Sequence, residues 1–129
     1  VPVYALFDAD GGFEARAKAK NKKQDDIDRE RNNHAVENRK LMRYFGLPEE
    51  DFPSATISDV VAIFDDNLET FLSVNWGEWT AACESVETET GINLAKNQLA
   101  YRTATLRSEG VVPKMLAQIL TRARGGVLD

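Results

Sequence analysis

Two aspartates separated by one residue, Asp8 and Asp10, follow a short apolar run and precede Gly11 and Gly12. In an extended segment the side chains of residues i and i+2 point the same way, so the two carboxylates are expected to converge. Converging carboxylates suit a hard cation such as Mg²⁺, and the glycines would let backbone or a phosphate group approach closely. The same residues also fit an ordinary turn that leads into a helix, because Asp and Gly are common turn formers.

A second acidic group, Glu69, follows Asn67 and Leu68 just after another apolar run. Parallel strands end at the same edge of a sheet, so Glu69 is expected within reach of a metal held by the aspartates. The alternative is an acid that is stabilised at a helix N-terminus by the helix dipole. Lys114 follows Pro113 at the start of an apolar helix, where the dipole disfavours a cation. This position implies a phosphate or carboxylate partner, with a plain surface lysine as the alternative.

A run of basic residues comes soon after the acidic pair. It could neutralise DNA phosphates, or it could pair with the acids that follow it and form a solvated helix. Its members are Arg16, Lys18, Lys20, Lys22 and Lys23. His34 lies in the same polar stretch without a second His or Cys at ligand spacing, so neither a zinc site nor a catalytic role is expected for it. Cys83 is the only cysteine and lies among apolar residues, which predicts a buried, reduced, structural thiol.

Two short apolar runs predict the strands that position these groups. The run Pro2–Phe7 is continuous and stops at the acidic pair, which suits a central parallel strand covered on both faces. Residues 60–64 form a second, β-branched run that also ends in acids. With a helix between them the two runs predict a βαβ unit, and residues 49–58 are expected to be a loop.

The rest of the pattern is helical. Residues 13–33 are highly polar, with Phe13 and Ile27 as the only large apolar residues, so we expect a projecting helix or a mobile connection there. From residue 37 the apolar spacing predicts a helix that docks on the sheet and stops at Gly46. Further helices are expected at about 68–72, 79–86, 93–108 and 113–124. Four residues at helical spacing predict the buried face of the last one: Leu116, Ile119, Leu120 and Ala123.

Length and composition fit a single domain. The chain has 129 residues, with 16 Lys and Arg against 21 Asp and Glu, a net charge of −5 that argues against gripping nucleic acid by bulk charge. No apolar stretch is long enough for a membrane span and no signal peptide is visible, so a cytoplasmic protein is expected. We expect an α/β fold: residues 1–66 hold the βαβ core with a polar helical insertion at about 13–34, and residues 67–129 are helical. The start at Val1 suggests a piece of a larger protein.

Taken in order, these motifs resemble the later part of the Toprim domain in the OLD (overcoming lysogenization defect) family of nucleases. The resemblance covers Val3 to about Arg124. It is carried by Asp8-Ala9-Asp10 after a strand, a helix ending Asn38-Arg-Lys-Leu-Met-Arg-Tyr-Phe-Gly46, Asn67-Leu68-Glu69 after the second strand, and Val112-Pro113-Lys114 before the last helix. It implies that Asp8, Asp10 and Glu69 are catalytic metal ligands and that Lys114 is an active-site lysine. It also implies a partial Toprim-like parallel sheet, whose first strand or strands would precede Val1.

The same resemblance implies a metal-dependent DNA endonuclease with a site for two Mg²⁺ or Mn²⁺ ions. DNA would be its partner, and we expect the full protein to form a homo-oligomer. Similar proteins carry an N-terminal ABC-type ATPase, and some act in defence against phage. This sequence contains no Gly-rich Walker loop, so ATP would act only through an upstream ATPase and Toprim segment, or through a partner chain.

Two other interpretations stay open. The segment Ala5-Leu6-Phe7-Asp8-Ala9-Asp10-Gly11 also resembles the nucleophile motif of haloacid-dehalogenase-type phosphatases, with Asp8 as nucleophile and Asp10 as acid and base. That family usually has Thr where this chain has Gly12, and its lysine precedes the later acidic pair, whereas Lys114 follows it. The third interpretation is a non-catalytic Toprim-like assembly module, in which the acids only cap helices and the helical half packs on a partner.

Overall fold

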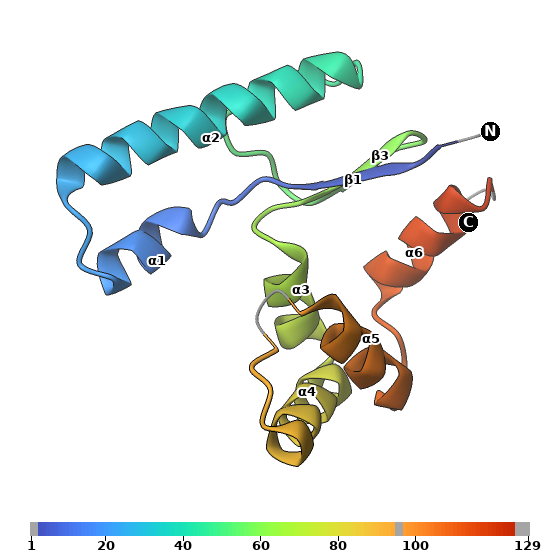
Figure 1. Ribbon diagram of the computed structural model, residues 1–129. Helices are drawn as coiled ribbons and strands as arrows, with labels where there is room; N and C mark the ends of the chain where they lie inside the picture. The colour runs from blue at the N-terminus through green and yellow to red at the C-terminus, as the bar shows by residue number, and fades with distance from the viewer. Residues whose placement is uncertain (1–2, 95–96, 126–129) are drawn as a thin grey trace. The chain divides into compact units, whose positions relative to one another are not determined.

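The computed structural model describes residues 3–94 and 97–125. In this part of the chain, six helices and three short strands form a mixed α/β fold (Figure 1). The chain divides into two compact units, and each is described by itself. The first spans Val1–Leu68 and Gln118–Asp129, and the second spans Glu69–Ala117. Among the described helices, none combines the length and the apolar character that crossing a membrane requires.

The sheet belongs to the first unit and has the strand order β1-β3-β2. Strand β1 (Ala5–Asp8) runs parallel to β3 (Val61–Phe64), which confirms the pairing predicted from the two apolar runs. All four residues of β3 are buried. In β1, burial alternates along the strand, and Leu6 is 47% exposed. The central strand, β3, is therefore the one whose β-branched run is covered on both faces.

Two expectations about the sheet are wrong. The run Pro2–Phe7, of which Pro2 lies outside the described residues, predicts a central strand, but β1 is an edge strand of the sheet that the described residues form. A continuous apolar run does not reveal which of its faces will be covered. Residues 49–58 predict a loop, but Thr56–Ile57 form β2, which pairs antiparallel with β3. A strand of two residues is too short to carry a readable period.

The polar stretch after β1 forms two helices, α1 (Phe13–Ala19) and α2 (Gln24–Tyr44), joined by a turn in which Asn21 has a φ of 56°. The expected boundary between a polar insertion and a docking helix at residues 34–37 does not exist, because α2 is continuous there. The few apolar residues of this stretch suffice to pack the two helices together. They form a small cluster with a partly buried aromatic ring: Phe13, Ala17, Ile27 and Phe52.

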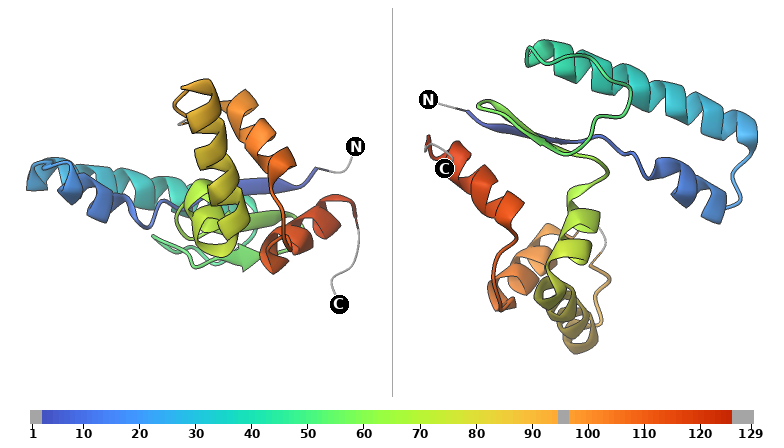
Figure 2. Two further views of the ribbon diagram at one scale, coloured as in Figure 1. Left: turned by 90° about the horizontal axis from the view of Figure 1, so that it is seen from below. Right: turned by 180° about the vertical axis from the view of Figure 1, so that it is seen from behind.

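The C-terminal half of α2 packs on one face of the sheet, as predicted (Figures 1 and 2). Met42 is buried against Val61 and Ile63, and the ring of Phe45 stacks on Phe7 at a centroid distance of 6.4 Å. Leu47 completes this contact after the helix ends. The face of α2 that carries these residues is the one that the apolar spacing after residue 37 indicates.

One buried polar side chain, Asn38, lies on the same face of α2 and is 3% exposed. Its Nδ2 donates hydrogen bonds to the carbonyl oxygens of Ala9 at 2.9 Å and Asp51 at 2.8 Å. Both carbonyl oxygens belong to residues outside the helices and strands, where no helix or sheet hydrogen bond is available to them. The side-chain amide of Asn38 supplies the missing donor. Asn38 thus ties α2 both to the end of β1 and to the loop that precedes β2.

The second unit is helical, with α3 (Leu68–Asn75) leading into it from the first unit, followed by α4 (Gly77–Thr90) and α5 (Gln98–Arg107). Helices α4 and α5 lie side by side (Figure 2). Between them is a small apolar core: Ala82, Val86, Leu94, Ala100 and Ala104. Cys83 is a partly buried free thiol packed against this core, and burial raises its pKa, followed by the charges of Glu87 and Glu84. The thiol is therefore held in its unreactive, protonated form.

The last helix, α6 (Lys114–Ala123), is present as predicted, but its buried face differs from the prediction. Ile119 is buried and Leu116 partly buried, whereas Leu120 and Ala123 are exposed. The buried side of the helix also carries Arg122, whose Nη1 donates to Asp59 Oδ1 at 2.6 Å. The side that holds Ile119 and Arg122 therefore faces the turn before β3.

The loops that follow β1 and β3 are joined by consecutive backbone hydrogen bonds. The amide nitrogens of Ala9, Asp10 and Gly11 donate to the carbonyl oxygens of Phe64, Asp66 and Asp65 at 2.9, 3.0 and 2.9 Å. The approach is so close that a Cβ placed on Gly11 would lie 2.7 Å from the Asp65 carbonyl oxygen. Glycine is required at this position by the space that the neighbouring backbone leaves.

Gly11→Ala is expected to lower the free energy of unfolding by about 1–3 kcal/mol, because a methyl group there can be accommodated only by separating the two loops. The measurement is urea unfolding, with amide hydrogen exchange at Ala9 and Asp10 as a local probe.

The matched control is Gly77→Ala, where a Cβ would meet no atom within 4 Å. At that helical position the change should be neutral or stabilising, by up to about 1 kcal/mol. If Gly11→Ala were as stable as the control, the two loops would not be in the close contact described.

Candidate active site

The acidic pair lies at the carboxyl end of β1, beside the end of the parallel strand β3. Asp8 is the last residue of the strand and is exposed, Ala9 is fully buried, and Asp10 is partly exposed. Asp10 has a φ of 56°, in the left-handed region that Asp tolerates better than most residues. The expectation that both aspartates lie in one extended segment is therefore wrong. The strand stops at Asp8, and the joined loops set the direction of Asp10.

A neighbouring acid, Asp66, lies in the loop that follows β3. Its carboxylate accepts hydrogen bonds from both terminal nitrogens of Arg16, at 2.6 and 2.9 Å, and from the amide of Gly12 at 3.1 Å. The hydrogen bonds from Arg16 lower the pKa of Asp66, and the same bonds raise the pKa of Arg16. Asp66 and Arg16 thus form a fork-shaped ion pair of the strong, charge-assisted type, which fastens α1 to the end of β3.

The carboxylate of Asp10 lies between two basic groups from two different helices. Arg16 Nη2 is 4.0 Å from Asp10 Oδ1, and His34 Nδ1 is 3.6 Å from Asp10 Oδ2. His34 also places its other nitrogen, Nε2, 3.9 Å from Glu30 Oε1. Acidic and basic groups therefore alternate along the contact, from Glu30 through His34, Asp10 and Arg16 to Asp66.

These groups surround a polar hollow of about 200 Å³, all of it in the first unit. The wall comes from the loop after β1, from α1, from the turn that follows and from α2. The lining residues are Asp10, Phe13, Arg16, Ala17, Lys20, Lys22, Glu30 and His34. Carboxylate and basic groups on one wall are the types of group that bind a hydrated cation together with a phosphate.

The structure divides the basic run into two sets. Arg16 is bound to Asp66, Lys18 pairs with Glu14 at 3.1 Å, and Lys22 pairs with Glu30 at 3.4 Å, as the solvated-helix alternative predicts. Lys20 and Lys23 are exposed, and neither makes an ion pair within residues 3–94 and 97–125. These two lysines can therefore bind an external anion without giving up an internal partner.

Glu69 lies in the first turn of α3, at the place predicted for it after the second strand. It lines a hollow of about 270 Å³ that belongs to the second unit, together with Glu84, Glu87 and Tyr101. Burial raises the pKa of Tyr101, and the charge of Glu69 adds to the rise. Glu69 is thus partly exposed and acidic in a polar setting, which is compatible with metal binding and equally with the helix-terminus alternative.

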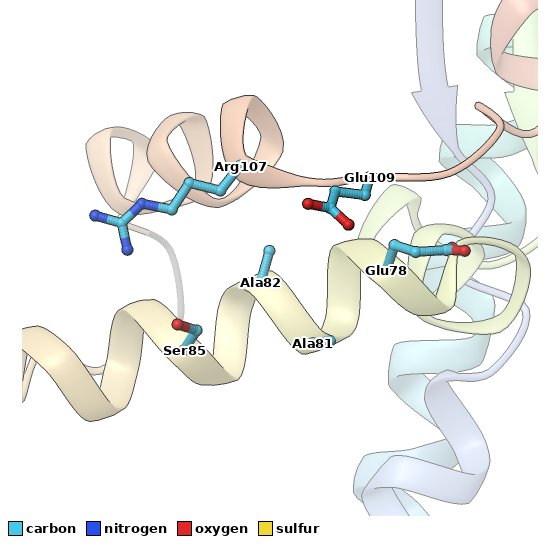
Figure 3. A pocket seen from close by; sticks show the side chains of 6 residues that line it. All are labelled: Glu78, Ala81, Ala82, Ser85, Arg107 and Glu109. Atoms are coloured by element: carbon cyan, nitrogen blue, oxygen red, sulfur yellow. The ribbon is translucent and has the colours of Figure 1, made fainter.

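The other sequence-predicted residue of the second unit, Lys114, begins α6 and is exposed. A separate hollow of about 280 Å³ lies along α4 and is drawn in Figure 3. There Glu78 comes from α4 and Glu109 from the segment after α5, and their carboxylates point in opposite directions, while Arg107 extends away from both and pairs with Glu89 at 2.5 Å. Arg107 is already paired with Glu89, and the lining offers no histidine or lysine that could act as a base for the hydroxyl of Ser85, so we do not take this hollow as the candidate site.

The donor groups near Asp10 are oxygen-rich and few. In the described ranges, no three His, Cys, Asp or Glu side chains gather closely enough to hold a metal ion by themselves. Mg²⁺ commonly takes only one or two carboxylates and completes its shell with water and substrate phosphates. A carboxylate such as that of Asp10, which lines the hollow, fits that mode of binding, whereas a closed zinc site would need four protein ligands.

Sequence reasoning missed three residues of this region: Asn38, Asp66 and His34. A signal existed for Asn38, because an amide on an apolar helix face demands a hydrogen-bond partner. Asp66 and His34 gave no such signal, since their partners lie 50 residues away at Arg16 and 24 residues away at Asp10. No family model matches the chain, and neither a curated protein nor a solved structure matches it.

Asp66→Asn is expected to destabilise the first unit at neutral pH by about 1–3 kcal/mol, because it removes a partly buried charge from the fork formed with Arg16. The pKa of Asp66 is lowered from 3.8 in the folded state, so its stabilisation is present above that value and is lost as the pH falls through the lower, folded value. In urea unfolding, the difference in the free energy of unfolding between the wild type and Asp66→Asn should therefore be present at pH 7 and become smaller at acid pH.

The control is Asp26→Asn, which removes an exposed ion pair between Asp26 and Arg29, both on α2. It should lower the free energy of unfolding by less than about 1 kcal/mol. If the loss in free energy of unfolding caused by Asp66→Asn stayed constant from neutral to acid pH, the role assigned to the charge of Asp66 would be contradicted.

Proposed function

We propose that this chain is part of a metal-dependent DNA endonuclease that hydrolyses phosphodiester bonds. The observation that supports this most is the position of Asp8 and Asp10 at the carboxyl end of a strand in a parallel pair, next to a hollow that also holds basic side chains. Open α/β sheets bind their ligands at this edge. Acids that can hold a divalent cation therefore lie beside bases that can hold a phosphate.

In this proposal Asp8 and Asp10 hold Mg²⁺ or Mn²⁺ through carboxylate oxygens, with Glu69 as a further acidic ligand from α3. The bound metal would supply activation of the attacking water and neutralisation of charge on the leaving oxygen, and a second ion of the same kind would complete a two-metal site. Because Asp8 is exposed and Asp10 partly exposed, both can be reached by water and by substrate.

The basic residues have separate roles in the proposal. Lys20 and Lys23 bind backbone phosphates of DNA away from the reacting bond, since neither has an acidic partner in the part of the chain that the structure describes. Arg16 orients the loop that carries Asp10, through Asp66, rather than binding DNA. Lys114 neutralises charge that develops on the scissile phosphate.

We further propose that the larger protein is of the OLD type, with a Toprim-like nuclease portion coupled to an ABC-type ATPase, and acts as a homo-oligomer in defence against phage. The order of motifs along the sequence supports this assignment. The close approach at Gly12 weighs against the phosphatase alternative. A Cβ on Gly12 would lie 2.4 Å from Asp66 Oδ2, so the Thr typical of that motif would displace the carboxylate that Arg16 binds.

Asp8→Asn and Asp10→Asn are each expected to abolish metal-dependent cleavage of DNA by the complete protein while leaving its melting temperature nearly unchanged. Asn has nearly the shape of Asp and tolerates the left-handed conformation of Asp10, and the contacts of Asp10 with Arg16 and His34 are long and partly exposed, so folding should lose little. The measurement is nicking of supercoiled DNA in Mn²⁺ or Mg²⁺, with Asp26→Asn as the control of the same chemistry on an exposed helix face.

Wild-type cleavage in both variants would reject the site. Hydrolysis of a phosphate monoester without DNA cleavage, together with capture of a phosphoaspartate analogue at Asp8, would favour the phosphatase.

The double variant Lys20→Ala and Lys23→Ala is expected to weaken DNA binding equally for different sequences. The slope of log K against log salt should fall by about 0.9 for each DNA phosphate that the variant no longer neutralises. Lys40→Ala is the control, because Lys40 is an exposed lysine of α2 paired with Glu37 and lies outside the basic run. An unchanged slope in the double variant would assign the run to the solvated-helix alternative.

A further inference from the structure

His34 lies on α2, one turn after Glu30, and its side chain is only 28% exposed. Its two ring nitrogens face two different carboxylates. Nδ1 is 3.6 Å from Asp10 Oδ2, and Nε2 is 3.9 Å from Glu30 Oε1. Since the two nitrogens lie on different edges of the ring, a single ion bound to one of them could not also bind both acids.

The direction of the imidazole ring is fixed by packing. The ring lies 5.0 Å from the ring of Phe13, tilted by 49°. Phe13 is itself buried and stacks on Phe52 at 5.8 Å. A surface histidine would rotate freely, but this one is held by an aromatic neighbour that belongs to the packing of α1 on α2.

Glu30, the acid on the far side of the ring, is also held. Its Oε2 lies 3.4 Å from Lys22 Nζ, while its Oε1 faces His34. Glu30 and Phe13 together therefore constrain the ring from one edge and one face, and leave Nδ1 directed at Asp10.

Asp10 has a basic group close to each of its two carboxylate oxygens. Arg16 lies 4.0 Å from Oδ1, but its two terminal nitrogens are already hydrogen-bonded to Asp66. His34 is nearer, because its Nδ1 lies 3.6 Å from Oδ2. The distance of 3.6 Å is slightly longer than a hydrogen bond, as is common in sites that tighten when they bind their ligands.

We infer that His34 is a positioning residue for Asp10: it holds Oδ2 from the α2 side, so that the carboxylate keeps one oxygen directed to the metal. This inference rests on the proposed nuclease function. Carboxylates that bind metals are usually held by outer partners, and loss of such a partner typically weakens metal binding about 10–100-fold. Sequence reasoning assigned no role to His34, because the contact with Asp10 exists only when α2 folds back beside the end of β1.

The test is titration of the 129-residue chain with Mn²⁺ at one fixed pH, followed by electron paramagnetic resonance of the free ion. His34→Ala and His34→Phe should each bind Mn²⁺ about 10–100-fold more weakly than the wild type. His34→Phe retains the packing against Phe13, so equal losses in both would come from the missing nitrogen. His34→Asn should recover much of the affinity, because its amide nitrogen can donate from nearly the position of Nδ1.

Asn33→Ala is the matched control on the exposed side of the same helix and should bind as the wild type does. A second measurement does not need the metal: the ¹⁵N chemical shift of His34 Nδ1 should change in Asp10→Asn. No change there, or wild-type Mn²⁺ affinity in both His34→Ala and His34→Phe, would overturn the inference and leave the proposed function standing. Absence of specific Mn²⁺ binding by the wild-type chain would instead overturn the proposed metal site, and the inference with it.

Discussion

The hydrogen-bonded contact between the loops after β1 and β3 is the constraint on which the rest of the first unit depends. Three consecutive amides on one side meet three carbonyls on the other, and no room is left for a side chain at Gly11. The contact ends β1 at Asp8, turns Asp10 into a left-handed conformation and brings Asp66 to where Arg16 can bind it. The conformations and positions of several neighbouring residues therefore follow from one close approach of two backbones, which also sets the shape of the candidate site.

The two helices that enclose the site are unusually polar, and this explains both how they pack and why the hollow beside Asp10 is lined with charged groups. A few apolar side chains, among them Phe13 and Ile27, supply the burial, and Asn38 anchors the longer helix to the loops. Exposed ion pairs such as that of Glu14 with Arg31 contribute little to stability, because both charges remain hydrated. They do, however, line the site with charge. A pair of apolar helices in the same place would have excluded the cation and the phosphate that the proposed reaction requires.

The sequence predicted where the acids of the candidate site lie relative to the strands and helices. Acids that follow buried runs can be recognised from residue type and order alone, and in the structure Asp8 ends β1 and Glu69 lies in the first turn of α3. The prediction of the direction in which these side chains point was less secure. The rule that residues i and i+2 point the same way holds only while the chain stays extended, and at Asp10 it does not. His34 and Asp66 could not be found, because nothing within a few residues of either one indicates its partner.

The sequence by itself determined the two buried runs that pair in parallel, the helical character of the second half and the docking face of α2. These features depend on continuous apolar runs or on apolar residues repeated every three or four positions, which neighbours in the chain reveal. Only the tertiary structure decided that β1 lies at an edge of the described sheet, that Thr56–Ile57 add a strand, and which side of α6 is buried. Those outcomes depend on contacts between distant segments, such as Arg122 with Asp59 or Arg16 with Asp66, whose energies exist only once the backbone has brought the partners together.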